Sequence, residues 1–563
     1  MTTADDLFTR HRETLDRALT ATRERSYWSA YPESLKAYGA DGAADGTVSA
    51  AEGKAAFDAY LGKPFPLQQP GVDGEAAGEH SPYGLDLGVT YPHTGTDAAV
   101  AAALAALPAW RDAGPDARAG VCLEILARIN ARSHEMACAV MHTSGQAYAM
   151  AFQAGGPHAQ DRALEAVAYA YAEMTRHVAE AVWEKPQGKR PPQRMTKRFA
   201  VVPRGLALVI GCNTFPTWNS YPGFFASLVT GNPVLVKPHP RAVLPLAITV
   251  VVAREVLTEA GFSPDLVLLM AEQEGEGLAK SLALRPEVRV IDYTGSSEFG
   301  TWLERNATHA AVFTEKAGVN TVVIDSTDDY DGMLANLAFS LSLYTGQMCT
   351  TPQNLLLPRA GITTDQGAKP VAQVAVDLAA AVDGLLADDS RATALLGAVV
   401  NQGVLDRIEQ APSYGEVVLA SREVKHPEFP GATVRTPTIV RLDVADRDRY
   451  LRECFGPVAF LITTDSTGQS IDLLRDTVRE QGAITASVYS TDEGVLRAAE
   501  EAALDAGVAL SCNLTETVYV NQSAAFSDFH ATGANPAANA ALTDAAYVAS
   551  RFRIVQSRRH LQT

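Results

Sequence analysis

The sequence predicts an α/β protein with two domains, each built around a mainly parallel sheet. The first observation is length, because 563 residues are too many for one small domain and fit two or three. The second is a regular alternation of short apolar runs and helical stretches that begins at residue 205. The third is a similar series after residue 349. Such alternation is typical of parallel sheets with helices on both faces.

The first series contains four apolar runs of strand length with helical stretches between them. Its strands are expected at 206–211, 233–237, 266–270 and 288–292. A first helix is expected to run through residue 227, a second to cover 241–260 and a third to lie near 276–285. Ligands of such sheets bind outside the carboxyl ends of the strands. Residues that follow these strands are therefore candidates for a binding site.

The second series begins after Cys349. Its strands are expected at 354–358, 416–420, 457–463, 484–489 and 507–512. The two series together place Cys349 near the junction of two α/β domains.

The flanking regions carry weaker signals. An N-terminal helical segment is followed by a Gly/Ala-rich stretch, 40–55, which we expect to be a loop or linker. Apolar residues at helical spacing predict a helix over 118–142, and a second helix is expected over 158–182. The stretch 184–204 is rich in Pro, Lys and Arg, and we interpret it as a solvated arm or hairpin.

Composition excludes several classes of function. The net charge of −18, from 47 basic and 65 acidic residues, argues against nonspecific binding of nucleic acid. The N-terminus lacks a secretion signal, and no apolar run approaches the ~20 residues that span a bilayer. The six cysteines are dispersed without a CxxC, and the histidines show no zinc spacing. A reduced, cytoplasmic protein without a metal or a membrane partner is the simplest expectation.

Several short stretches carry chemistry but are ambiguous when taken singly. Cys349, in "SLYTGQMCTTPQN" (341–353), is either a nucleophile or a core thiol. No GxGxxG occurs, but "YTGSSEFG" (293–300) offers a turn and a helix N-terminus to a ligand. Lys237 could hold a ribose or a phosphate, although a lysine at a strand end is usually solvated. A lone glutamate such as Glu315 is usually a solvated carboxylate. An aromatic residue before Gly-Pro, such as Phe455, is usually a turn or core residue.

Taken together, the stretches resemble a known family. Seven of them occur in the order and at close to the spacing of the aldehyde dehydrogenase superfamily, over roughly residues 95 to 550: "NTFPTWNSYPGFFASLVTGNPVLVKPHP", "YTGSSEFG", "TEKAGVN", "GQMC", "TPTIV", "ECFGPV" and "ITASVYS". The stretches "RSYWSAYPES", "CNTFPTWNSYPG" and "FSDFHATGANPAANAAL" are similar to the PaaN-type branch, which is linked to phenylacetate degradation.

The resemblance implies a domain organisation. It predicts an N-terminal helical extension (1–55), a Rossmann-like NAD(P)-binding domain (56–315) and a second α/β catalytic domain (316–525). It also predicts a small oligomerisation arm at about 184–204. The chain would end in a C-terminal return segment with an oligomerisation strand (526–563). We expect a homodimer or homotetramer, with the C-terminal strand added to the sheet edge of another subunit.

The resemblance also implies roles for the catalytic residues. Cys349 would be the nucleophile, and we expect the site to lower the pKa of its thiol, because only the thiolate attacks a carbonyl. Asn213 would donate to the oxyanion, but this chain has one residue more than the usual Asn-Phe-Pro, so Asn219 stays an alternative. Glu315 would be the general base that activates water. The alternative is that Lys316 pairs with Glu315 and holds it unproductively.

Cofactor-binding residues follow from the same resemblance. Glu453 would hold the nicotinamide ribose, and Phe455 would lie beside the nicotinamide ring. Gly295 and Ser296 would form the phosphate turn, and Lys237 would contact the adenosine ribose. Lys237, a possible imidazolium at His239 and Arg241 stand in a stretch with no nearby carboxylate, which favours NADP and leaves NAD possible.

The predicted function is the NAD(P)-dependent oxidation of an aldehyde to a carboxylate. The branch resemblance suggests a semialdehyde, linked to coenzyme A, from aromatic or phenylacetate catabolism. Three alternatives stay open: a CoA-acylating aldehyde dehydrogenase, a cysteine hydrolase and a non-catalytic scaffold subunit. A hydrolase would need a histidine close to Cys349, and the sequence shows none in a recognisable motif. The aromatic stretch "TWNSYPGFF" (217–225) is interpreted as helix packing rather than as a substrate tunnel.

Overall fold

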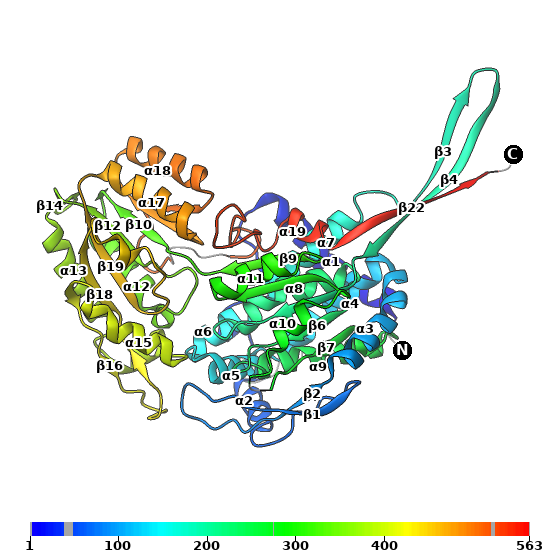
Figure 1. Ribbon diagram of the computed structural model, residues 1–563, viewed down its shortest axis with the longest axis horizontal. Coiled ribbons are helices and arrows are strands. Elements are labelled where there is room, and N and C mark those ends of the chain that lie inside the picture. The colour runs from blue at the N-terminus through cyan, green and yellow to red at the C-terminus, as the bar shows by residue number, and fades with distance from the viewer. Residues whose placement is uncertain (1–2, 39–48, 274, 519–523, 562–563) are drawn as a thin grey trace.

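A five-stranded parallel sheet forms the centre of the first domain in the computed structural model, which describes residues 3–38, 49–273, 275–518 and 524–561 (Figure 1). Its strand order is β7-β6-β5-β8-β9. The strands are β5 (Leu206–Ile210), β6 (Val234–Lys237), β7 (Val267–Leu269), β8 (Val288–Gly295) and β9 (Ala311–Lys316). The four strands predicted for this series are confirmed, and β9 is an addition to them.

Side chains alternate between the two faces of this sheet, as the pleat of a strand requires. Ala207 and Val209 of β5 belong to one hydrophobic core, while Leu206, Leu208 and Ile210 belong to another. The first core is covered by α8 (Pro216–Val229) and α9 (Leu244–Glu259), and the second by α3 (Thr96–Asp112), α10 (Leu278–Ala283) and α11 (Ser297–Asn306). Both faces are therefore buried, which explains the continuous apolar runs of the sequence.

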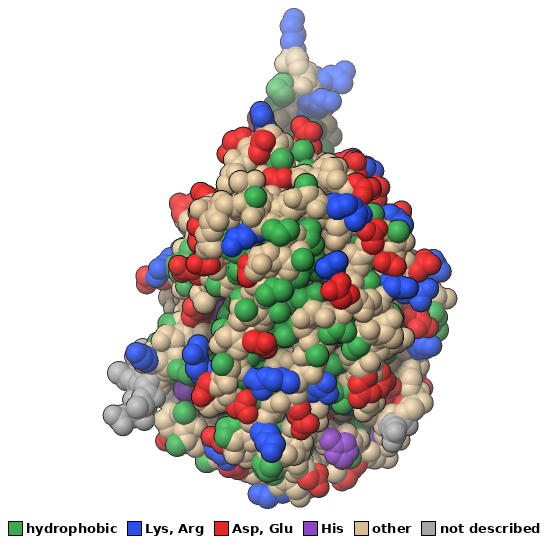
Figure 2. Space-filling model, turned by 90° about the vertical axis from the view of Figure 1, so that its left-hand side faces the viewer, with side chains coloured by type: hydrophobic (Ala, Val, Ile, Leu, Met, Phe, Trp, Pro, Cys, Tyr) green, Lys and Arg blue, Asp and Glu red, His purple; other side chains and the backbone are tan. Residues whose placement is uncertain are grey.

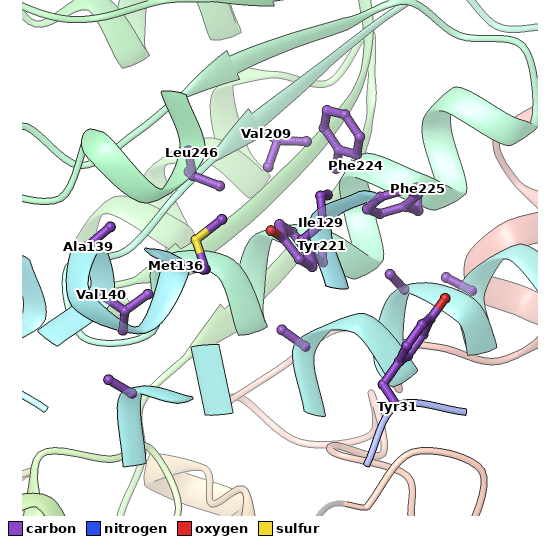
Figure 3. Packing of buried hydrophobic residues seen from close by; sticks show 14 of the residues in the cluster. Tyr31, Ile129, Met136, Ala139, Val140, Val209, Tyr221, Phe224, Phe225 and Leu246 are labelled. Atoms are coloured by element: carbon purple, nitrogen blue, oxygen red, sulfur yellow. The ribbon is translucent and has the colours of Figure 1, made fainter. Parts of the chain in front are cut away.

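The aromatic residues of α8 belong to the first core. Tyr221, Phe224 and Phe225 are buried beside Val209 and Leu246, and Ile129 and Met136 face them from neighbouring helices (Figure 3). Helix packing, as predicted for "TWNSYPGFF", is the role of these three rings. Trp218, one turn earlier in α8, differs because it is only partly buried.

A seven-stranded sheet forms the second domain, with strand order β15-β18-β19-β12-β10-β20-β21. All neighbours are parallel except β15 and β18. The strands are β10 (Thr321–Ile324), β12 (Asn354–Pro358), β15 (Glu416–Leu419), β18 (Thr438–Asp443), β19 (Val458–Thr464), β20 (Thr485–Tyr489) and β21 (Ala509–Cys512). The five predicted strands are present, whereas β10 and β18 were not part of the predicted series.

Helices cover both faces of this sheet as well. One face packs on α12 (Tyr330–Ser342) and α13 (Val371–Leu385), and the other on α15 (Gln402–Gln410), α17 (Thr467–Gln481) and α18 (Glu493–Ala506). Figure 2 views the molecule from the side of this domain and shows a hydrophobic area among acidic and basic side chains. The predicted boundary at 315/316 falls at the end of β9, and the division into domains stays a prediction.

A long antiparallel arm projects from the first domain (Figure 1). It consists of β3 (Glu180–Gln187), β4 (Arg190–Pro203) and the C-terminal β22 (Phe552–His560), in the order β22-β4-β3. The hairpin expected over 184–204 is present. The C-terminal strand β22 pairs along its whole length with β4 of the same chain, and it is the edge strand of this three-stranded sheet. Its addition to a sheet of another subunit stays a prediction.

The N-terminal extension packs on the helices of the first domain. Helix α1 (Ala4–Glu24) contacts α4 (Gly114–Ala131) and α7 (Ala159–Met174). The single helix predicted over 118–142 is two helices, α4 and α5 (Ser133–Ser144), because Arg132 between them leaves the helical conformation. The helix predicted over 158–182 ends at Met174, and β3 follows it.

The stretch 40–55 was predicted to be a loop. Residues 39–48 lie outside the described residues. Residues 50–55 were predicted wrongly, because they belong to α2 (Ala50–Asp58). This helix begins with a capping box at Ser49. The remaining elements are η1 (Leu35–Tyr38), β1 (Val72–Ala76), β2 (Tyr91–Thr94), α6 (Tyr148–Gln153), η2 (Ala154–His158), η3 (Pro264–Leu266), β11 (Ser326–Thr327), η4 (Leu343–Gly346), β13 (Ile362–Thr364), β14 (Gly367–Lys369), α14 (Asp389–Leu396), η5 (Ala411–Ser413), β16 (Glu423–Val424), β17 (Val434–Arg435), α16 (Arg447–Tyr450) and α19 (Ala545–Ala549). In the described part of the chain, no helix has both the length and the apolarity that a bilayer crossing requires.

Candidate active site

One cleft of about 620 Å³ brings the predicted residues together. It lies at the carboxyl ends of β5, β6, β8 and β9, and loops of the second domain form its opposite wall. All nine residues singled out in the sequence line this cleft: Asn213, Lys237, His239, Gly295, Ser296, Glu315, Cys349, Glu453 and Phe455. These residues therefore lie together at the edge of the sheet where the rule for open α/β sheets expects a ligand.

The loop that carries Cys349 has an unusual backbone. Tyr344, Thr345 and Gly346 have successive φ values of 51°, 54° and 61°, a left-handed conformation that only glycine adopts at low cost. Hydrogen bonds hold it there, because the Thr345 hydroxyl donates to Leu396 O at 2.8 Å and the Tyr344 hydroxyl to Ser144 O. A methyl group on Gly346 would lie 2.6 Å from Gly456 O, so the chain passes here with no spare room.

Asn320 fixes the other side of this loop. Its side-chain amide donates to Cys349 O at 2.8 Å and to Thr351 O at 2.9 Å, and its oxygen accepts from the backbone N–H groups of Ile484 and Thr485. Every polar atom of this amide is therefore used. The loop is tied in this way to the edge of β20, and Cys349 has a defined position at the end of the cleft.

The Cys349 thiol is partly exposed at the bottom of the cleft. Burial by the surrounding protein raises its pKa well above the usual value, and the nearby carboxylate of Glu315 raises it further. The expectation of a lowered pKa was wrong for this arrangement. The thiol keeps its proton here, and attack on a carbonyl requires a group that removes it.

Glu315 is the carboxylate beside this thiol. It lies near the end of β9 and is 1% exposed. Burial raises the pKa of its carboxyl group, but the charge and the hydrogen bond of His530 and hydrogen bonds from Cys349 and Asn219 outweigh burial, so the pKa is lowered. Glu315 is thus an ionised carboxylate held against the thiol. The alternative partner, Lys316, contacts Glu304 at 2.9 Å instead, so it does not hold Glu315 unproductively.

His530 is the site residue that the sequence did not identify. Its Nε2 lies 2.9 Å from Glu315 Oε1 and 3.7 Å from Cys349 Sγ, and its side chain is 2% exposed. It belongs to the segment "FSDFHATGANPAANAAL", which was noticed only as a family resemblance. The one available signal was a histidine in that segment, far along the chain from the nucleophile.

Two asparagines compete for the role of oxyanion donor, and both line the cleft. The Asn213 amide donates to Thr143 O at 3.0 Å, which leaves its second N–H for another acceptor. The Asn219 amide donates to Glu315 Oε2 at 2.7 Å, from the second turn of α8. Asn219 is therefore occupied with the base, and the assignment of Asn213 stays a prediction.

The far end of the cleft holds the residues expected to bind the cofactor's adenosine half. Lys237 ends β6, is 5% exposed and forms an ion pair with the carboxylate of Glu272, so it is not a solvated lysine. Burial and the charges of Lys237 and Arg241 lower the pKa of His239 to about 4, which leaves the ring neutral at physiological pH. Two premises of the NADP preference were wrong, because a carboxylate does lie near Lys237 and His239 is not a cation.

Between the two ends, the cleft offers groups that suit a dinucleotide. Ser296 caps α11 by accepting from Phe299 N–H at 3.3 Å, so the N-terminus of this helix opens next to Gly295. Glu453 lines the opposite wall of the cleft, where its side chain is exposed. The surrounding protein partly excludes water from its carboxyl group, which raises the pKa of that group to about 7. Phe455 lies beside it, with its carbonyl accepting from Arg407 Nε at 2.7 Å. A cation, a helix N-terminus and an open carboxylate in one elongated cleft fit the ribose and phosphate groups of NAD or NADP.

The ligating atoms of Cys349, Glu315 and His530 lie within 4.8 Å of one another. Their arrangement is that of a hydrogen-bonded cluster, because the 2.9 Å between Nε2 and Oε1 is a hydrogen-bond distance. Neighbouring ligands of a tetrahedral ion, at bonds of about 2.0–2.1 Å, would be separated by about 3.3 Å. The prediction that this protein uses no metal stays untested.

Comparison with known proteins identifies the family. The family model described as "Aldehyde dehydrogenase family" matches residues 91–546. The chain belongs to the aldehyde dehydrogenase family. A crystal structure of an NAD-dependent aldehyde dehydrogenase from Burkholderia multivorans is 57% identical, covers 100% of both chains and superposes with a TM-score of 0.96.

The chain is also similar, at lower identity, to proteins named 1-pyrroline-5-carboxylate dehydrogenase. A 1-pyrroline-5-carboxylate dehydrogenase from Bacillus licheniformis is 26% identical over 78% of this chain and 84% of its own length. A structure of the Thermus 1-pyrroline-5-carboxylate dehydrogenase with bound NAD, 21% identical, covers 91% of this chain and 96% of its own, with a TM-score of 0.70. The two-domain fold is thereby confirmed, and the finer resemblance to the PaaN-type branch stays a prediction.

Proposed function

We propose that this enzyme oxidises an aldehyde to a carboxylate, with Cys349 as nucleophile, Glu315 as base and a nicotinamide dinucleotide in the cleft. The observation that carries the proposal is the pairing of a cleft-facing thiol with an ionised, buried carboxylate, at one end of a cleft whose donors suit a dinucleotide. The family membership supports an oxidoreductase of this class.

The chemistry assigned to the chain begins with a proton. Glu315 accepts the proton of Cys349 Sγ, and the sulfur then forms a covalent bond to the aldehyde carbon. The second N–H of Asn213 and the backbone N–H of Cys349 would bind the oxygen of the resulting thiohemiacetal. The nicotinamide, when bound, supplies a hydride acceptor, and the acyl group is left on Cys349 as a thioester.

Glu315 then performs a second task. After giving its proton to solvent, the carboxylate removes a proton from the water that cleaves the thioester and releases the free acid. A CoA-acylating enzyme would not need this base, because a thiol would accept the acyl group. The ionised Glu315 at this position therefore favours hydrolysis over transfer to CoA.

The cysteine-hydrolase alternative is less consistent with the contacts of His530. In catalytic triads one ring nitrogen contacts the nucleophile and the other contacts the carboxylate. Here Nε2 lies near both the sulfur and the carboxylate oxygen. The ring therefore does not relay a proton through its two nitrogens.

We propose NAD as the preferred cofactor, with NADP as the alternative. Glu272 beside Lys237 suits the two ribose hydroxyls and repels a 2′-phosphate, and the neutral His239 offers no compensating charge. The NAD dependence named for the Burkholderia multivorans protein supports the same preference.

For the substrate we propose a semialdehyde. The PaaN-type resemblance suggests one that is linked to CoA and formed in aromatic degradation, while the relatives named 1-pyrroline-5-carboxylate dehydrogenase favour a smaller semialdehyde derived from proline. We also propose a cytoplasmic homodimer or homotetramer, in keeping with six free cysteines and a projecting arm.

An aldehyde panel tests this proposal. Simple aldehydes, glutamate semialdehyde and CoA-linked semialdehydes are incubated with NAD or NADP, and nicotinamide reduction and products are measured with and without free CoA. We expect reduction of NAD and release of a free acid whether or not CoA is present, and loss of both in Cys349→Ser. Equal turnover in Cys349→Ser would overturn the assignment, and acyl-CoA formed only with CoA would establish the acylating alternative.

A further inference from the structure

The segment that carries His530 is anchored at its start by α7 and the N-terminal extension. Phe526 N–H donates to Glu165 Oε1 at 3.2 Å, and Arg162 donates to Asp528 O at 3.0 Å. From the extension, Trp28 packs edge-on against the Phe526 ring, with centroids 4.9 Å apart. Four residues before the histidine, the chain is therefore fixed by buried polar and aromatic contacts.

The same segment is anchored again after His530. Lys316 N–H donates to Ala537 O at 2.6 Å, and Thr314 N–H donates to the Asn539 side chain at 2.8 Å. These contacts lay the segment along β9, the strand that carries Glu315. The position of His530 relative to Glu315 is thus set by backbone pairing on one side and by buried contacts on the other.

The imidazole itself lies against both the Glu315 carboxylate and the Cys349 thiol. The Trp218 ring packs against it at 4.5 Å with an interplanar angle of 74°. Glu315 Oε1 lies 2.9 Å from Nε2, and Cys349 Sγ lies 3.7 Å from the same nitrogen. Because an ionised carboxylate only accepts hydrogen bonds, Nε2 must carry a hydrogen that points toward Oε1.

Among the described residues, several elements bring charged or titratable groups near this ring. Glu315 on β9 and Cys349 on the loop after η4 contact the ring directly. Cys212, which follows β5, interacts electrostatically with both Glu315 and Cys349. On α7, the Arg162 guanidinium lies over the Trp218 ring at 5.7 Å from its centroid, and Glu165 accepts from Phe526 N–H. Asp528 on the same segment accepts from Ala524 N–H.

We propose that His530 is a further catalytic residue: its Nε2–H holds the Glu315 carboxylate against the Cys349 thiol and then stabilises the thiolate that forms. The inference rests on the proposed function for the roles of Cys349 and Glu315. The proton balance is simple. The S–H bond of Cys349 breaks, an O–H bond forms on Glu315, and the Nε2–H of His530 turns from the neutralised carboxyl group to the new thiolate. Nothing is oxidised or reduced in this step.

Alkylation of Cys349 tests this role without aldehyde or nicotinamide. Iodoacetamide labelling is followed by peptide mass spectrometry over a range of pH, with Cys512 as internal reference because it is also partly exposed. The variants are His530→Leu, which removes the donor, and His530→Gln, which keeps an N–H. The matched control is His134→Leu, a histidine that is also buried but hydrogen-bonds Tyr148 in the core.

We expect Cys349 in His530→Leu to react about tenfold to a hundredfold more slowly at neutral pH, the effect of one lost hydrogen bond to a charged group. His530→Gln should recover part of that loss, and His134→Leu should match the wild type. Unchanged or faster labelling in a folded His530→Leu protein would overturn the proposal. If His530→Leu does not fold, His530→Gln carries the test: labelling of Cys349 that is slower than in the wild type at neutral pH supports the role of His530, and labelling at the wild-type rate at every pH overturns it.

A second measurement separates this role from mere packing. The acidic limb of the pH profile of kcat/KM reports protonation of Glu315, whose pKa His530 lowers. Without His530 that pKa rises, so activity should begin to fall at a higher pH as the solution is acidified. A limb that stays in place in His530→Leu would contradict the proposal. The absence of any aldehyde oxidation in the wild type would instead defeat the proposed function, while the alkylation result would still stand on its own.

Discussion

The two ends of the cleft are built in opposite ways. At the chemical end, Glu315 and His530 are almost completely buried, and the Glu315 oxygens have hydrogen-bond partners on four separate segments. At the cofactor end, Glu453 is exposed to the cleft and His239 is only partly buried. Lys237 is the exception, since its buried charge is paired with Glu272.

The difference follows from what each end has to do. Proton transfer and covalent attack need atoms held within about half an ångström, which is achieved by side chains locked in mutual hydrogen bonds. A dinucleotide brings its own hydroxyl and phosphate groups, so the residues that bind it need open polar atoms instead. The comparison predicts that substitutions at the chemical end reduce turnover, while substitutions at the cofactor end change selectivity.

The largest expected effect is that of Glu315→Gln. The amide keeps the shape of the side chain but cannot accept a proton, so we expect kcat to fall by about 10²- to 10⁴-fold. Stopped-flow detection of reduced nicotinamide and mass spectrometry of the acyl-enzyme check it. The control is Glu304→Gln, which removes a carboxylate of the same region that pairs with Lys316 and is expected to keep turnover. Wild-type turnover in Glu315→Gln would break the distinction between the two ends.

The next effect tests the loop beneath the nucleophile. Gly346→Ala places a methyl group 2.6 Å from Gly456 O at a φ of 61°, so strain and overlap together should cost about 3 kcal/mol of stability. Displacement of Cys349 by about 1 Å would also lower kcat by about a hundredfold. Thermal unfolding and steady-state kinetics check both.

Gly62→Ala is the matched control for that loop. Gly62 has a φ of 67° but no atom within 4 Å of the added methyl group, so it carries the backbone strain without the overlap. Equal losses of stability and activity in the two variants would show that the contact with Gly456 does not position the nucleophile.

The sequence predicted the frame of the site better than its contacts. The strands of the first domain were predictable because strands buried on both faces are continuous apolar runs, and their order along the chain placed Lys237 and Gly295 at the correct edge. Cys349 and Glu315 were identified by a set of motifs that resemble one family. None of this required knowledge of how distant segments pack.

What the sequence missed depends on such packing. His530 reaches Cys349 from 181 residues away through a segment that only the fold lays along β9. Glu272 meets Lys237 because β6 and β7 are neighbours in the sheet, so a carboxylate is present where the local sequence showed none. The raised pKa of Cys349 likewise arises from burial and from Glu315, neither of which is visible near "GQMC".

At the cofactor end, Glu272→Gln should change selectivity by about tenfold. Loss of the carboxylate frees the Lys237 ammonium for a 2′-phosphate and removes the acceptor that suits ribose hydroxyls, so the ratio of kcat/KM for NADP to that for NAD should rise. The control is Glu276→Gln, from the same loop, whose carboxylate contacts His93 and not Lys237. An unchanged ratio in Glu272→Gln would show that the ion pair does not select the cofactor.

The smallest expected effect concerns His239. Its pKa is lowered from 6.5 to about 4, so the ring gains a proton only as the pH falls well below neutrality, and it adds no attraction for a 2′-phosphate above about pH 5.5. We expect the KM for NADP to follow the same pH dependence in wild type and His239→Asn, within about twofold. The variant is the necessary reference because a phosphate itself titrates near pH 6. If NADP binding tightened between about pH 8 and about pH 5.5 only in the wild type, the ring would be titrating near its ordinary pKa. The cofactor end would then carry a charge switch that the present geometry does not contain.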